Sequence, residues 1–112
     1  MEYGLGDWEG LCSAFADLFE GLGDVKSDES RLEFTSFPSD VATGLSIYRD
    51  GSMLANMPLH GIDSRFERVI FDERGESIRL IGPETDYTYR VPPAILRRRG
   101  GLRGLSRLWR LR

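Results

Sequence analysis

Apolar residues near the N-terminus recur at spacings of three and four, which is typical of one face of a helix. They are Trp8, Leu11, Cys12, Phe15, Leu18, Phe19 and Leu22. Asp7 is a suitable N-cap, and Gly21 and Gly23 are suitable stop signals. We therefore predict an amphipathic helix over about residues 8–21, with its opposite face in solvent.

Beyond residues 23–30, a polar segment that we expect to be a loop, the hydrophobic period changes from that of a helix to two. Alternation of this kind predicts half-buried strands. The predicted strands are residues 31–37, 45–48, 53–57, 66–72, 77–81 and 87–91, with turns at 61–64, 74–75 and 82–84. Pro92 and Pro93 stop the last strand and can open a short helix.

Asp50-Gly51 is the strongest hairpin signal in the chain. A two-residue turn there would set Tyr48 opposite Met53 and Ile47 opposite Leu54. The order of elements predicts an α+β fold, in which the N-terminal amphipathic helix packs on one face of an antiparallel meander of five or six short strands, followed by a short C-terminal helix. We expect the uncovered face to carry aromatic and basic side chains, namely Tyr48, Tyr87, Tyr89, Arg49 and Arg79.

Charge divides the chain of 112 residues into two parts. Residues 1–94 hold all 18 acidic residues and 8 basic ones, whereas residues 95–112 hold seven arginines and no acidic residue, so a net charge of −3 conceals the contrast. Such asymmetry is typical of an interaction segment on a compact body. We therefore predict a single α+β domain over residues 1–94 and a basic arm, rich in arginine and leucine, over residues 95–112.

An acidic body in which Lys26 is the only lysine fits two settings, a GC-rich genome or a cytoplasm of molar salt. About half of the chain resembles small uncharacterised proteins of salt-loving archaea. The segments that carry the resemblance are Phe37-Pro38-Ser39-Asp40, Tyr48-Arg49-Asp50-Gly51, Met57-Pro58-Leu59-His60-Gly61 and Tyr89-Arg90-Val91-Pro92-Pro93. The resemblance implies a habitat and a fold, and it carries over no active site.

Candidate chemistry in the body is sparse, and we predict no catalytic residue. His60, the only histidine, would need a substrate proton within reach and an orienting carboxylate such as Asp63 or Asp40, and no spacing marks such a set. A structural or surface histidine is the simpler interpretation. If the protein binds a small ligand or is an enzyme, the site would lie near Tyr48, Arg49 and His60.

Metal and cofactor sites are not indicated either. Cys12 is the only cysteine, which excludes a disulfide framework, and its place on an apolar helix face predicts a structural role rather than a nucleophile. The acidic residues Asp24, Asp28 and Glu29 miss the spacing of a calcium loop. We predict no metal and no cofactor.

The basic arm is the most informative segment. A helix from Leu102 would place Leu102, Leu105, Leu108 and Trp109 on one side and arginines on the other, which suits a protein groove, an anionic membrane or nucleic acid. The candidate contact residues are Arg97, Arg98, Arg99, Arg103, Arg107, Trp109 and Arg110. The arm could instead be a disordered end, or dock on the acidic body of its own chain or of a symmetric copy.

The leading hypothesis is a small non-enzymatic binding or assembly module that uses the arm for a protein partner or a homo-oligomer. Nucleic-acid binding through the arm, and a ligand or enzymatic site near His60, are the alternatives. Molar salt would weaken phosphate contacts and favour apolar ones. The acidic N-terminus and the lack of a long apolar stretch predict a cytoplasmic protein without a transmembrane segment.

Overall fold

A computed structural model describes residues 1–57 and 60–100, except for the side chains of residues 57, 60–64 and 100. The elements in chain order are β1 (Glu2–Gly4), α1 (Trp8–Phe19), β2 (Gly23–Ser27), β3 (Arg31–Ser36), β4 (Gly44–Tyr48), β5 (Ser52–Met57), β6 (His60–Arg65), β7 (Arg68–Phe71), β8 (Ser77–Ile81), β9 (Asp86–Arg90), the short helix α2 (Pro93–Leu96) and the 3₁₀ turn η1 (Arg97–Gly100). The α+β class and the short helix after Pro92 are therefore confirmed.

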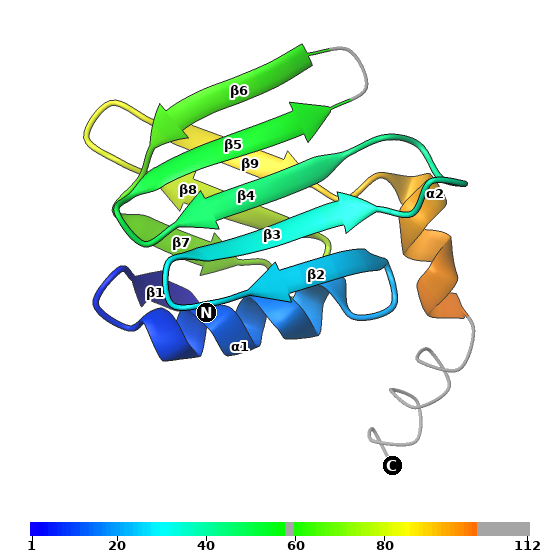
Figure 1. Ribbon diagram of the computed structural model, residues 1–112, viewed down its shortest axis with the longest axis horizontal. Helices are drawn as coiled ribbons and strands as arrows, with labels where there is room; N and C mark the ends of the chain where they lie inside the picture. The colour runs from blue at the N-terminus through cyan, green and yellow to red at the C-terminus, as the bar shows by residue number, and fades with distance from the viewer. Residues whose placement is uncertain (58–59, 101–112) are drawn as a thin grey trace.

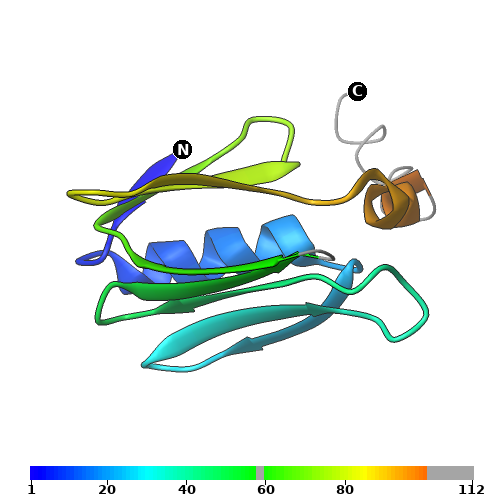
Figure 2. The same ribbon diagram turned by 90° about the horizontal axis from the view of Figure 1, so that it is seen from above.

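The strands of the described residues form two antiparallel sheets rather than one meander of five or six strands. The first sheet is four-stranded, in the order β1-β7-β8-β9, and the second is five-stranded, in the order β2-β3-β4-β5-β6. The two sheets lie face to face, with the five-stranded sheet in front in Figure 1 and below in Figure 2. Each sheet therefore buries one face against the other, as in a sandwich.

Helix α1 forms where the sequence predicts it, but its place in the fold differs from the prediction. The Asp7 side chain accepts a hydrogen bond from the backbone N–H of Gly10 at 3.1 Å, which confirms the N-cap. Instead of covering one face of a single sheet, α1 contacts β1, β2 and β3. Figures 1 and 2 show it along the side of the sandwich where β1 and β2 end the two sheets, so that its apolar side closes the core there.

Three strands that the sequence pattern does not predict lie at sheet edges. β2 and β6 replace a predicted loop and a predicted turn, and β1 was not predicted at all. In β2 only Val25, half-buried and packed against the core, and Gly23 are not exposed, so an apolar alternation hardly exists. An edge strand that is buried so little leaves a weak period-two signal, which explains why β2 was missed.

The β4–β5 hairpin forms, but its register is one residue away from the prediction. Met53 faces Ile47, and Leu54 faces Ser46. The Gly51 N–H donates to the Tyr48 carbonyl at 2.9 Å, and Gly51 has a φ of +95°, a conformation that glycine adopts without a Cβ clash. The chain thus uses a three-residue loop rather than a two-residue one. As a result Ile47 and Met53 share the buried face, while Tyr48 and Leu54 point outward.

Aromatic rings from α1 and from both sheets meet in the core. Phe19 of α1 stacks on Phe34 of the five-stranded sheet, with ring centroids 4.0 Å apart, and meets Tyr89 of the four-stranded sheet edge-on at 6.1 Å. Tyr89 is fully buried, so the expectation that it lies on an uncovered face is wrong. Tyr87 shares the inner face and is half-buried, because side chains two residues apart in a strand point the same way.

The Tyr89 hydroxyl links the two sheets directly. It lies 2.7 Å from Oγ1 of Thr43, in the loop before β4. Thr43 Oγ1 in turn donates to the backbone carbonyl of Asn56 in β5 at 2.9 Å. Because the threonine hydroxyl has one proton and gives it to the carbonyl, the tyrosine hydroxyl is the donor to Thr43. Burial raises the pKa of Tyr89 from 10.0 to about 12.

This pKa predicts a loss of stability at high pH that depends on one hydroxyl. Because the folded state holds the Tyr89 proton more tightly than the unfolded state does, the protonated hydroxyl contributes its full stability below pH 10. This contribution is lost as the pH rises toward 12. The full loss would be on the order of 2 to 3 kcal/mol. In denaturant titrations, Tyr89→Phe should show a smaller fall in the free energy of unfolding over that range than the unmodified chain. Tyr48→Phe, on the outer face, is the matched control, and an equal fall in all three proteins would contradict the prediction.

Candidate interaction site at the C-terminal segment

The first part of the predicted arm is packed on the body. Pro93 stands in the first turn of α2, where its missing N–H costs no helical hydrogen bond. Ile95 is fully buried in the core, four residues after Val91, which is also buried. Figure 1 shows α2 and η1 at the end of the sandwich where β3 and β9 finish. The start of the segment is therefore fixed by an apolar anchor.

Arg98 binds the loop between β3 and β4. Its Nε donates to Oδ2 of Asp40 at 2.7 Å, and its guanidinium carbon lies 4.6 Å from the centre of the Phe37 ring. The Asp40 side chain is only 19% exposed, and its hydrogen bond raises the pKa of the Arg98 guanidinium. Stacking on the ring fixes the plane of the guanidinium, and the hydrogen bond to the carboxylate fixes the direction in which it points. Arg98 therefore fixes the segment to the body.

Arg99 binds the C-terminal end of α1. Its Nη2 donates to the carbonyl of Leu18 at 2.5 Å, one of the carbonyls that a helix end leaves without an intrahelical partner. The last turn of α1 holds no basic residue, and the acidic residues Asp17 and Glu20 stand there. A cation at this end complements the helix dipole, so Arg99, far along the chain, supplies the positive charge that the last turn of α1 lacks.

The three neighbouring arginines of the predicted contact set thus differ in environment. Arg97 is exposed on the surface, Arg98 is bound by Asp40 and Phe37, and Arg99 is half-buried against α1. The remaining members of that set are Arg103, Arg107, Trp109 and Arg110, which lie outside the described residues. The role of the whole set in binding stays a prediction.

The alternative site near Tyr48, Arg49 and His60 is not brought together by the backbone. Tyr48 lies on the outer face of β4, whereas Arg49 turns toward α1, where its guanidinium carbon lies 6.0 Å from the centre of the Trp8 ring. His60 pairs with Met57, at the end of β5 that is farthest from the hairpin loop of Arg49. The length of β5 therefore separates His60 from the hairpin loop that holds Arg49 by roughly 17 Å. The His60 side chain lies outside the described part of the structure.

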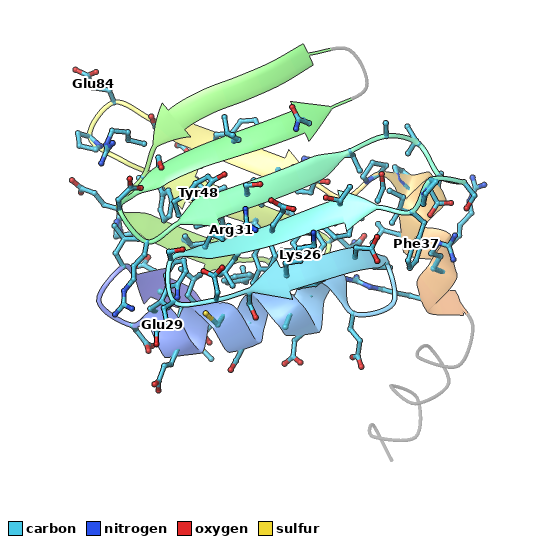
Figure 3. All side chains as sticks on the ribbon, viewed as in Figure 1. Lys26, Glu29, Arg31, Phe37, Tyr48 and Glu84 are labelled. Carbon is cyan, nitrogen blue, oxygen red and sulfur yellow. The ribbon has the colours of Figure 1, made fainter. Side chains whose placement is uncertain are left out.

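A shallow depression of about 720 Å³ opens on the outer face of the five-stranded sheet. Its lining includes Tyr48 and the loop that holds Phe37 and Asp40, and both Tyr48 and Phe37 are labelled in Figure 3. Its acidic members are already engaged, since Glu33 lies 3.7 Å from Arg31 and Asp40 binds Arg98. Small-molecule sites are usually enclosed and apolar with a few converging polar groups. This open surface lacks that character.

Cys12 is half-buried against the core, and burial raises the pKa of its thiol. The thiol therefore stays protonated at neutral pH, which disfavours it as a nucleophile. Within residues 1–57 and 60–100, the described side chains include no group of three or more His, Cys, Asp or Glu placed to hold a metal ion. No helix in those ranges is long and apolar enough to cross a membrane.

Comparisons with known proteins add no family: no family model, no curated protein and no solved structure matches this chain. The resemblance to proteins of salt-loving archaea therefore stays a prediction.

The residues that hold the C-terminal segment were not recognised from the sequence. Asp40 and Arg98 are 58 positions apart, and Leu18 and Arg99 are 81 apart. Neither pair belongs to a local pattern, and the Leu18 contact is to a backbone carbonyl that any residue type would offer. The one available signal was general, namely an acidic body and a basic segment in the same chain.

Arg99 should contribute to stability far more than Arg97. Arg99→Ala removes a charged donor from a helix-end carbonyl and should lower the free energy of unfolding by about 1 to 2 kcal/mol. Arg97→Ala, an exposed control in the same turn, should change it by less than about 0.5 kcal/mol. Urea unfolding followed by circular dichroism measures both. Equal effects would show that the contact with Leu18 adds nothing.

Proposed function

We propose that this protein is a small non-enzymatic binding or assembly module, in which residues 101–112 make protein contacts from a base fixed on the body. The observation that supports the proposal is the anchoring of the segment immediately before them by Ile95, Arg98 and Arg99. An arm attached to a fixed segment loses less conformational freedom on binding than an arm attached to a mobile segment.

The sequence of the arm favours an apolar contact with a basic border. Residues 101–112 hold four leucines and Trp109 among four arginines. Tryptophan and arginine are the residue types most enriched among the strongest contributors to protein interfaces. The body has a large excess of acidic residues, so a second copy of the chain offers a surface of opposite charge. Self-association is therefore the form of this function that we rank first.

Nucleic-acid binding remains the competing proposal, and the geometry weakens its electrostatic part. Arg98 and Arg99 already serve the body, which leaves Arg97 and the four arginines of residues 101–112 for phosphate contacts. The affinity of basic segments for nucleic acid rises with the number of phosphates neutralised. No observation among the described residues supports a ligand or enzymatic site near His60.

Two triple variants of the full chain separate these proposals. Replacing Leu105, Leu108 and Trp109 by serine removes apolar contacts, whereas replacing Arg103, Arg107 and Arg110 by serine removes charge. We expect the apolar triple variant to reduce the assembly mass in light scattering at both low and molar salt. The arginine triple variant should weaken assembly at low salt only, because molar salt already screens its charges.

Two outcomes would contradict the proposal. Unchanged assembly in the apolar triple variant would remove the arm from the contact. Binding of a labelled oligonucleotide that is lost in the arginine triple variant and kept in the apolar one would favour nucleic acid as the partner.

A further inference from the structure

Strand β9 ends the four-stranded sheet on the side away from α1. The edge strands on the opposite side of the molecule, β1 and β2, flank the helix. Figure 2 looks onto the side away from α1 and shows β9 running along it, with α1 behind. An edge strand presents unpaired backbone groups to any strand that can approach it.

The hydrogen bonds to β8 show which backbone groups of β9 face this open edge. The Val91 N–H donates to the Glu76 carbonyl at 2.9 Å, and the Gly82 N–H donates to the Thr85 carbonyl at 2.7 Å. In an antiparallel pair, hydrogen-bonded and non-hydrogen-bonded positions alternate. Given the register of β8 and β9, residues 85, 87, 89 and 91 point their backbone groups toward β8. Asp86, Thr88 and Arg90 therefore point their N–H and C=O groups outward.

In the part of the chain that the structure describes, this edge lacks the usual devices that prevent pairing. Protected edges carry a proline, a lysine directed inward, a bulge or a covering segment. The sequence of β9 is Asp86-Tyr87-Thr88-Tyr89-Arg90, and its register with β8 is continuous, without a bulge. Among the described residues, no strand pairs with β9 on its outer side. Its central three residues carry no charge that would repel a second strand.

We propose that β9 pairs antiparallel with β9 of a second copy of this chain, about a two-fold axis that passes between the two Thr88 residues. In this register Thr88 faces Thr88 of the second copy, and Asp86 faces Arg90 of the second copy. These are the three positions whose backbone groups point outward, so each facing pair exchanges two hydrogen bonds. The two four-stranded sheets become one continuous sheet.

The side chains of β9 complement each other in the same register. Asp86 and Arg90 are both exposed, and they lie on the outer face of the sheet with Thr88. Arg79 of β8 donates to both carboxylate oxygens of Asp86, at 2.7 and 2.5 Å, and so holds this carboxylate on the outer face of the sheet. Opposite charges that face each other across strands stabilise the pair, as does a pair of threonines. On the inner face, half-buried Tyr87 would gain Tyr89 of the second copy as a neighbour.

The expected dimer is weak and depends on concentration, because one short strand from each copy buries less surface than a standard interface. This contact uses a surface other than the arm, so it does not rest on the function proposed above. It can hold when that proposal fails, and the reverse is also true.

Charge reversal on the full chain tests the register. Arg90→Asp places two carboxylates opposite each other, and Asp86→Arg places two guanidinium groups opposite each other. Each variant alone should dimerise about tenfold more weakly than the unmodified chain in sedimentation equilibrium. An equimolar mixture of the two should recover dimers, since each Asp then faces an Arg. Arg74→Asp, in the exposed β7–β8 turn, is the control with the same change of charge and should dimerise normally.

Circular dichroism first establishes that each variant is folded, and the loss of the exposed Arg79–Asp86 pair should cost little. Recovery of dimers in the mixture, with both single variants dimerising more weakly than the unmodified chain, supports the proposal. A monomeric chain at millimolar concentration overturns it, as do dimers that neither variant weakens or that the mixture fails to restore. The apolar arm variant should leave this rescue intact, which separates the two contacts.

Discussion

The fold depends on the buried side chain of Tyr89, which connects helix α1 and the two sheets. Its ring meets Phe19 of α1, and its hydroxyl meets Thr43, which is itself bonded to the carbonyl of Asn56 in the other sheet. A polar group in this position would be costly without partners, so the hydrogen bond fixes how the two sheets face each other. Apolar packing alone would tolerate several alignments of two sheets, whereas a directional bond selects one.

The C-terminal segment rests on elements that also contact Tyr89. Thr43 belongs to the loop that also carries Phe37 and Asp40, the two residues that hold Arg98. Phe19 belongs to the last turn of α1, whose Leu18 carbonyl accepts from Arg99. Both surfaces on which the basic segment rests thus adjoin residues that contact Tyr89. β9 carries Tyr89 inward and its outward backbone groups to the open edge, so the core contact also sets the geometry of the proposed pairing.

The sequence predicted the elements that depend on interactions between residues close together in the chain. The stripe from Trp8 to Phe19, the Asp7 cap and the turn at Gly75, with its φ of +69°, all depend on residues within a few positions of one another. The edge strand β2 was missed because it buries little on either face. The hairpin register was wrong by one residue, since Asp50-Gly51 suits both two-residue and three-residue loops. The partition into two sheets and the contacts of Arg98 and Arg99 depend on pairs far apart in the chain, which a single sequence does not disclose.

The central claim, that the hydroxyls of Tyr89 and Thr43 act together to join the sheets, is tested most directly by a double-mutant cycle. The free energies of unfolding of the unmodified chain, Tyr89→Phe, Thr43→Val and the double variant give the coupling between the two groups. We expect the double variant to be more stable than the sum of the single losses predicts, with a coupling of about 1 kcal/mol or more. Additive losses would show that the two hydroxyls do not act together, and the account of how the layers are aligned would then be wrong.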